Sequence, residues 1–174
     1  LFNEARLGKA IDIEQCLPIV EEISTSVARN SSALIGLARL KTKDEYTYMP
    51  SVSVCALMVA LAQQLGLDNE QIREAGIAGL LHDVGKIVIP GVVLNKPGKL
   101  TDDEFSVMRR HPELGHAMLL KSELIPKCAL DVCLHHHEKI DGTGYPHSLQ
   151  GQQISILARM AAICDVYDAI TSNR

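Results

Sequence analysis

Residues 68–86 read DNEQIREAGIAGLLHDVGK, and this stretch predicts a helix that ends in a polar pair. Asp68 and Gln71 stand at the spacing of a helix N-terminal capping box. The small and apolar residues after them predict a helix that runs towards Leu81. Two strongly polar residues, His82 and Asp83, follow at once. The fold class then depends on whether the rest of the chain follows the same helical pattern.

The helical pattern continues on both sides of this stretch. Capping-box spacings at 42–45 and 101–104 predict two more helix starts. Only residues 87–89 resemble a strand, and three residues are too few to found a sheet. Glycine and proline predict irregular loops at 89–100 and 141–146. We therefore expect an all-α fold. Periodic apolar positions predict the other helices at 1–40, 51–65, 112–121, 126–137 and 153–172.

The composition is that of one globular domain with a substantial core. The chain has 174 residues, of which 47% are hydrophobic and 22% charged. Its net charge of −4 argues against a general nucleic-acid coat, because such binding needs a basic face. Aromatic residues make up 3%, with no Trp, so no platform of stacking rings for single-stranded nucleic acid is expected. We expect no nucleic-acid polymer as a partner, whereas a small anionic ligand stays open.

The cysteines and the apolar runs predict a cytoplasmic protein. The five cysteines form no CxxC pair and stand among apolar residues, which favours reduced thiols in a reducing cytosol. We expect no membrane span, because no run of about 18 apolar residues is present, and we see no signal peptide. The chain starts at Leu1 and its last helical pattern stops at Arg174 without a terminating signal. A fragment of a longer chain, truncated at the C-terminal end, is therefore expected.

His82 and Asp83 are the first candidates for a metal site. Burying an aspartate at the end of an apolar helix is costly unless it is paired or bound to a cation. Asp83 has no Lys or Arg beside it within that helix, because Lys86 lies beyond Gly85. A metal ion accounts for an imidazole and a carboxylate side by side in such surroundings.

Two later segments carry the same type of residue. His135, His136 and His137 lie in a row, and consecutive helical residues diverge by about 100°. Two of them can share a metal only near a helix end, and the following loop provides that end. Asp165 lies inside a strongly apolar helix and is a second buried carboxylate that needs a cation. Asp168 is the weaker candidate and is expected at a cap or at the surface.

At this point the sequence resembles a known family. Residues 82–86 read HDVGK and resemble the HDxGK signature of the HD-domain metal hydrolases. Residues 136–146 read HHEKIDGTGYP and match the HHExxDGxGYP signature of the HD-GYP subfamily at every defined position. Residues 109–115 and 165–171 are similar to the intervening and closing segments of that subfamily. The resemblance covers 44–174.

The resemblance implies a fold, an activity and a ligand set. The fold is an HD-type helical bundle with a metal centre in its core, formed by residues 41–174 behind an N-terminal helical extension of residues 1–40. The activity is hydrolysis of cyclic di-GMP to linear pGpG, with GMP as a further product, by a hydroxide that bridges two divalent ions, iron or manganese. The implied catalytic residues are Asp83, the ligand shared by both ions, and Lys86, which would also contact a substrate phosphate. A solvated loop lysine is the alternative for Lys86. The implied metal ligands are His82, Asp83, His111, His136, His137 and Asp165.

The GYP loop is the other part of the implied site. Gly142 and Gly144 permit a positive φ and a close backbone approach, while Pro146 fixes the exit of the loop. Tyr145 either packs the loop down or faces the ligand. We expect both glycines and Tyr145 among the substrate-binding residues, and the resemblance implies contacts of this loop with GGDEF-type diguanylate cyclase domains. The remaining histidines are expected at the surface or behind the ligands: His116, His135 and His147.

One position departs from the family. Residues 46–51 read YTYMPS and resemble a family segment, Tyr-Thr-x-x-His-Ser, whose His is normally a metal ligand. Pro50 stands at that position and cannot coordinate a metal. Proline is tolerated at the start of a helix but not in its interior, so 42–48 and 51–65 are predicted to be separate or kinked at Pro50. The first metal keeps three protein ligands: His82, Asp83 and Asp165.

Two functions of different classes stay open. The first is a cyclic di-GMP phosphodiesterase. The second, which Pro50 favours, is a catalytically impaired module that acts as a cyclic di-GMP receptor or as a protein-docking domain. A phosphohydrolase acting on another nucleotide is disfavoured by the complete GYP loop. Residues 1–40 would link to a sensory or receiver domain or form a homodimer face, and the sequence does not decide between these roles.

Overall fold

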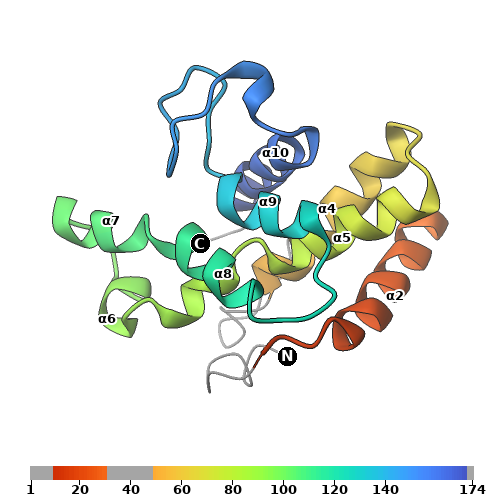
Figure 1. Cartoon of the computed structure of the whole chain (residues 1–174), viewed down its shortest axis with the longest axis horizontal. Coiled ribbons are helices and arrows are strands. Elements are labelled where there is room, and N and C mark those ends of the chain that lie inside the picture. Colours follow the sequence, from red (N-terminus) through yellow and green to blue (C-terminus); the bar gives the residue numbers. More distant parts are fainter. Residues whose placement is uncertain (1–9, 31–48, 172–174) are drawn as a thin grey trace.

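The computed structural model describes residues 10–30 and 49–171, and every regular element within these two ranges is helical (Figure 1). The predicted all-α class is confirmed. The longer helices are α2 (Cys16–Arg29), α4 (Met49–Gln64), α5 (Asn69–Leu81), α8 (His111–Leu119), α9 (Lys127–His135) and α10 (Ile156–Thr171). The shorter ones are η1 (Ile13–Gln15), η2 (Val84–Val88), α6 (Gly91–Leu94), α7 (Asp102–Met108) and η3 (Gly151–Gln153).

Helix α5 forms the centre of the bundle. It packs against α2, α4 and α9, and its second half is buried from Ala75 to Leu81. The predicted start is confirmed, because the Asp68 side chain accepts a hydrogen bond from the Gln71 amide in a complete capping box. Glycine allows the close approach of α4: a Cβ on Gly79 would lie 2.9 Å from the Cα of Cys55. The helix that ends in His82 is therefore fixed on three sides.

Helix α2 shares this core. Its buried face consists of Cys16, Val20, Ile23 and Val27, which belong to the same hydrophobic cluster as the buried residues of α4 and α5. The predicted boundary between residues 1–40 and 41–174 falls in 31–48, which lies outside the described residues, and it stays a prediction. The capping box at 42–45 lies there as well.

The segment after α5 differs from the prediction. Residues 87–89 are not a strand: Ile87 and Val88 close the 3-10 helix η2, because Gly85 brings this segment against α8. The predicted loop 89–100 contains the short helix α6. From there α6 and α7 extend to one side of the bundle (Figure 1). Helix α7 starts with the capping box predicted at Thr101.

Pro50 lies in the first turn of α4, which begins at Met49. The N-terminal position tolerates proline, because its missing N–H has no partner within the helix. Residues 42–48 lie outside the described residues, so the predicted separation or kink at Pro50 stays a prediction. No helix in the ranges 10–30 and 49–171 is both long and apolar enough to cross a membrane.

Candidate metal centre

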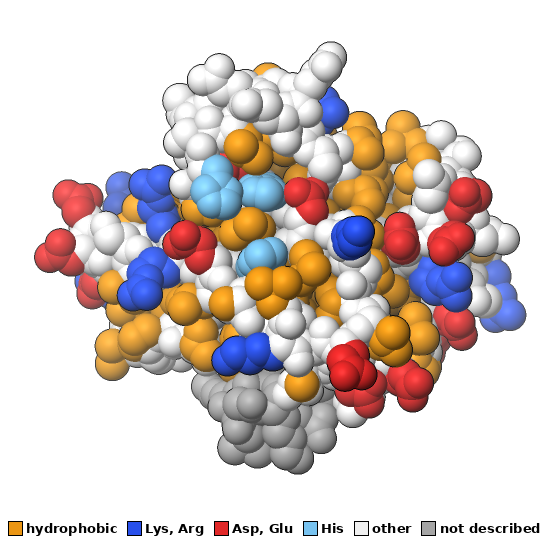
Figure 2. Space-filling view, viewed as in Figure 1, with side chains coloured by type: hydrophobic (Ala, Val, Ile, Leu, Met, Phe, Trp, Pro, Cys, Tyr) orange, Lys and Arg blue, Asp and Glu red, His pale blue; other side chains and the backbone are white. Residues whose placement is uncertain are grey.

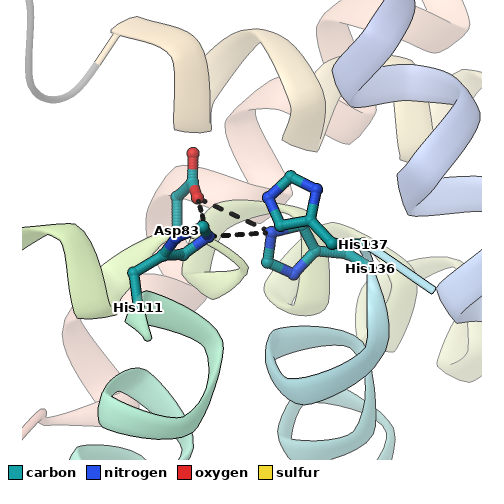
Figure 3. A group of neighbouring side chains, drawn as sticks. All are labelled: Asp83, His111, His136 and His137. Atoms are coloured by element: carbon teal, nitrogen blue, oxygen red, sulfur yellow. Dashed lines mark hydrogen bonds and ion pairs between the residues drawn. The ribbon is translucent and has the colours of Figure 1, made fainter. Parts of the chain in front are cut away.

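Four segments meet at Asp83. Asp83 follows α5, His111 opens α8, His136 caps the C-terminal end of α9, and His137 follows it. Figure 3 shows the four side chains pointing towards one another. Their ligand atoms all lie within 4.8 Å of one another. The predicted position of two consecutive histidines at a helix end is confirmed.

One carboxylate oxygen of Asp83 faces two of these imidazoles. Its Oδ1 lies 3.2 Å from Nε2 of His111 and 3.6 Å from Nε2 of His136. The two Nε2 atoms are 3.4 Å apart. His111 and His136 are each about 1% exposed. Three polar atoms therefore converge on one buried point.

The other ring nitrogens show what these atoms carry. Nδ1 of His111 lies 2.8 Å from the Met108 carbonyl, and Nδ1 of His136 lies 3.0 Å from the Val132 carbonyl. A carbonyl only accepts, so each Nδ1 carries a proton, and in the neutral ring this leaves a lone pair on Nε2. Two lone pairs and a carboxylate oxygen that face one another repel unless a cation lies between them. Imidazoles anchored on backbone carbonyls are typical of metal ligands.

A second group shares Asp83. Nε2 of His82 lies 3.3 Å from Oδ2 of Asp83 and 3.8 Å from Oδ1 of Asp165, and these three residues also satisfy the spacing of a metal site. Nδ1 of His82 is anchored on the Gly79 carbonyl at 2.8 Å. Asp83 therefore belongs to two adjoining ligand groups, with one carboxylate oxygen directed at each.

The residues fit divalent cations. Nε2 of His82 and Oδ1 of Asp83 are fully buried and make no hydrogen bond within the described part of the chain. Buried polar atoms without a partner are rare in native proteins. Imidazole nitrogens with carboxylate oxygens suit several divalent ions, including iron, manganese and zinc. Cations at these two points would give both orphaned atoms a partner.

The electrostatics of the site agree with this fit. Burial alone would lower the pKa of His82, but the charges of Asp83 and Asp165 raise it to about 10. The two carboxylates therefore favour a positive charge at this position. Burial, together with the neighbouring histidines, lowers the pKa of His137 to about 2. Burial would raise the pKa of Asp165, but the contact with His82 brings it to about 2. Neutral His137 and ionised Asp165 are the forms that bind metal.

Lys86 lies at the same carboxylate. Its Nζ is 2.5 Å from Oδ2 of Asp83, and its side chain is one-third exposed. Burial would raise the pKa of Asp83, but Lys86 and His82 hold it well below its usual range. Gly85 is not a flexible hinge before this lysine, because a Cβ there would lie only 1.9 Å from the His111 carbonyl. The backbone before Lys86 is therefore closely packed, and the lysine reaches the centre along its own side chain.

The GYP loop folds back onto the end of α9. Tyr145 donates its amide to the His137 carbonyl at 3.2 Å. Gly144 is buried, and a Cβ there would lie 2.4 Å from the Cα of Glu138. Gly142 has a φ of +78° and packs beside Gln150. Both glycines thus have a packing role, and their contact with a substrate stays a prediction.

The sequence analysis assigned no role to two residues that contact the GYP loop, Glu138 and Arg109. Glu138 is buried, and its carboxylate accepts the amides of His147 at 2.6 Å and Leu149 at 3.0 Å, which fixes the exit of the GYP loop. The guanidinium of Arg109 lies 4.5 Å from the centroid of the Tyr145 ring. The signal for Glu138 was its place in the HHE motif, whereas nothing local to Arg109 indicated its contact.

The other histidines lie outside both ligand groups, as expected. His135 contacts Asp131 at 2.8 Å and His147 at 3.1 Å. Burial and the charges of His135 and His147 lower the pKa of His116. Histidine side chains are visible at the surface over the α8–α9 region (Figure 2). Asp168 differs from its expected place at a cap or surface, because it is buried within α10.

Comparisons with known proteins agree with this geometry. The sequence profile of the HD domain family matches residues 22–174. A cyclic di-GMP phosphodiesterase of Pseudomonas aeruginosa is 61% identical over the whole chain, which spans 42% of that protein. A cyclic di-GMP phosphodiesterase response regulator of Xanthomonas campestris is 40% identical over 99% of the chain, which spans 46% of it. The chain therefore covers less than half the length of these two relatives.

A solved structure supports the fold. An HDG"Y"P protein from Bdellovibrio bacteriovorus superposes with a TM-score of 0.80 over 98% of this chain and 55% of its own, at 22% sequence identity. An all-helical bundle with a shared His/Asp centre defines the class, and the chain belongs to the HD domain family. Its complete HHExxDGxGYP segment makes it an HD-GYP domain protein.

Proposed function

We propose that this chain is the metal-dependent catalytic domain of a phosphodiesterase that hydrolyses cyclic di-GMP to linear pGpG and onwards to GMP. The observation that carries the proposal is Asp83, whose two carboxylate oxygens serve two adjoining ligand groups. The names of the two curated relatives support cyclic di-GMP as the substrate. The proposal concerns the whole protein, of which this chain is the HD-GYP part.

The ligand groups would hold two divalent ions. His82 and Asp165 would hold the first ion, His111, His136 and His137 the second, with Asp83 shared by both. Two such ions lower the pKa of a water between them and offset charge on a phosphodiester. Iron or manganese is the proposed metal, in line with the His/Asp ligands.

The residues around the ions have separate tasks. Asp83 stays ionised and keeps the two groups together, since Lys86 and His82 hold its pKa low against the effect of burial. Lys86 is the proposed phosphate contact, because its ammonium group lies at the edge of the centre and is partly exposed. The buried imidazoles of His111 and His136 would act as ligands through Nε2, because each Nδ1 is held on a backbone carbonyl.

Partners and location are further parts of the proposal. The loop from Asp141 to Pro146 is the proposed docking element for GGDEF-type diguanylate cyclase domains, and a homodimer is a proposal for the assembly. The five cysteines are free thiols, which supports a reducing, cytoplasmic location.

The test is turnover by the purified chain, loaded without oxygen with Fe(II) or Mn(II) and given cyclic di-GMP. Chromatography should show linear pGpG, then GMP. His136→Asn should abolish the product, whereas His116→Asn, a histidine outside both groups, should retain it. A parallel reaction with 3′3′-cGAMP measures selectivity for the base. No linear product with any metal would reject the enzyme.

The alternative is a cyclic di-GMP receptor or docking domain. Pro50 favours it, because the first group has three candidate ligands among residues 10–30 and 49–171 and proline adds none. Calorimetry separates the two functions. Tight nucleotide binding without any turnover, equal with and without added metal, would establish the receptor, whereas binding that needs the metal and leads to product would establish the phosphodiesterase.

A further inference from the structure

His137 differs from the other histidines of the centre in how its ring is held. The rings of His82, His111 and His136 are each anchored by Nδ1 on a backbone carbonyl. Within residues 10–30 and 49–171, no hydrogen bond reaches the ring of His137. Its ring instead stacks on Tyr145, with the centroids 4.8 Å apart and the planes 24° from parallel.

Tyr145 is itself held in place from two directions. Its amide donates to the His137 carbonyl at 3.2 Å, so the backbone of the loop is fixed to the same residue that its ring covers. The guanidinium of Arg109, at the C-terminal end of α7, lies over the Tyr145 ring at 4.5 Å from the centroid. A cation over an aromatic face is attracted by the ring quadrupole. Arg109 and two residues of the HHExxDGxGYP segment thus form one stack that ends at His137, a candidate metal ligand.

The stack has a specific consequence for metal binding. A histidine ligand binds best when its ring orientation is fixed beforehand, which a hydrogen bond to Nδ1 normally achieves. An aromatic contact restricts the same rotation, because the two rings stay parallel only over a narrow range of side-chain angles. The ring of His137 also contacts the rings of His136 and His111, which belong to the same ligand group. The stacked contact with Tyr145 comes from outside that group.

We propose that Tyr145 and Arg109 are positioning residues that orient the His137 imidazole towards the cation held with Asp83, His111 and His136. The inference deepens the proposed function and rests on its second metal site. It gives the tyrosine of the GYP loop a task at the ligand itself, and it assigns a role to an arginine outside the HD and GYP motifs.

The test measures metal affinity rather than turnover. Mn(II) is titrated into the chelator-treated chain by calorimetry, and Co(II) absorption reports the geometry of the ligands. Tyr145→Leu should weaken the second site by about tenfold, within the range seen when the partner of a metal ligand is removed, and should change the Co(II) spectrum. Tyr145→Phe keeps the ring and should restore both. Arg109→Met should shift both in the same direction as Tyr145→Leu, by less.

Matched controls exclude a general loss of structure. Tyr167→Leu makes the same change at a partly exposed tyrosine of α10, and Arg110→Met makes it at the neighbouring exposed arginine. Neither should change Mn(II) affinity. A double variant tests the route of the effect: once His137→Ala has removed the ligand, Tyr145→Leu should cause no further loss of affinity.

The results separate this inference from the proposed function. Equal Mn(II) affinity in the wild type and in Tyr145→Leu would overturn the positioning role and leave the phosphodiesterase standing. Weakened affinity in Tyr145→Leu, without turnover of cyclic di-GMP by the wild type, would sustain the positioning role and reject the enzyme. A loss of affinity in Tyr145→Leu that persists undiminished in the His137→Ala background would overturn the inference, as would a wild-type chain that binds no Mn(II).

Discussion

Two residues at the candidate metal centre have buried polar atoms without a hydrogen-bond partner in the described part of the chain. Asp83 and His82 place buried polar atoms where no protein hydrogen bond reaches them within the described residues. Glu138 shows the opposite arrangement, because both of its carboxylate oxygens are occupied by backbone amides of the GYP loop. A buried carboxylate thus leaves an oxygen available to a cation at Asp83, whereas at Glu138 both oxygens hold the GYP loop.

Glu138→Gln should destabilise the chain by about 1–3 kcal/mol, the cost of leaving a buried donor without a partner. The amide group of glutamine offers one acceptor oxygen, so its NH2 group would face the amide of His147 or Leu149. Urea unfolding followed by circular dichroism measures the change. Glu123→Gln, at an exposed loop position, should stay within about 0.5 kcal/mol of the wild type. Equal free energies of unfolding in the two variants would contradict the role of Glu138 in holding the GYP loop.

Pro50→His should raise the affinity of the first metal site. The resemblance to the family segment implies an imidazole at this position, where it would join the three candidate ligands His82, Asp83 and Asp165. Because Pro50 lies in the first turn of α4, histidine fits there without loss of an internal hydrogen bond. Metal analysis after dialysis should show more bound metal per chain than in the wild type. An unchanged metal content would mean that position 50 does not reach the ion.

Helix ends and glycine contacts position the ligands at the scale of elements. His82, His111 and His136 each lie at a helix terminus, so the orientation of a whole helix sets the direction of each ring. The contact between Gly85 of η2 and Gly115 of α8 joins two of these elements without any side chain between them. Changes at this contact therefore act on the metal centre through the backbone.

Gly85→Ala should both destabilise the chain and weaken the second metal site. The new Cβ would meet the His111 carbonyl and the Gly115 amide, so α8 must move and carry His111 away from Asp83. Overpacking of this kind costs about 1–3 kcal/mol. Thermal unfolding and Mn(II) calorimetry measure the two effects. Gly91→Ala is the matched control, because the nearest atom to its Cβ would be 3.8 Å away, and it should leave Mn(II) affinity unchanged.

The sequence predicted those elements whose signals are local. The capping boxes at Asp68 and Thr101 fixed two helix starts, because the cap and its partner lie within one turn. The candidate pair His82 and Asp83 was indicated because such a pair at the end of an apolar helix is costly to bury without a cation. The structure places Lys86 at Asp83, although the sequence analysis set that lysine beyond the helix. His111 was named only through the resemblance to the HD-GYP subfamily. Residues 87–89 were predicted wrongly, since β-branched residues favour a strand while the packing of Gly85 on α8 imposes a 3-10 turn. Arg109 could not be predicted, because its contact with Tyr145 depends on where a distant loop lies.

The whole molecule buries most of its thiols in one core. Burial raises the pKa of Cys55 from 9.0 to about 12 and that of Cys164 to about 12, while burial and the charge of Asp12 raise that of Cys16 to about 11. A folded thiol therefore keeps its proton at a pH at which the unfolded chain has lost it. Unfolding then releases protons, so a higher pH favours the unfolded state.

The free energy of unfolding should fall as the pH rises above about 9. It should be unaffected by the thiols below that value, where both states are protonated, and each thiol such as Cys55 should lower it by up to about 1.4 kcal/mol per pH unit until the folded pKa is reached. Urea unfolding at pH 8, 9 and 10 measures the slope. The free energy of unfolding of Cys55→Ala should be lower at pH 8, because the change removes buried volume. It should fall less steeply as the pH rises. An identical slope would show that this thiol ionises in the folded chain.

The candidate ligands come from positions as far apart as His82 and Asp165, and they meet only when α5, α8, α9 and α10 are all in place. An ion bound there holds the ends of these helices together and favours the native form by mass action, by about 4 kcal/mol when the free ion is a thousandfold above its dissociation constant. In a cell starved of the metal that binds there, we therefore expect this domain to lose resistance to proteases. Metal supply would then set how long the folded domain survives.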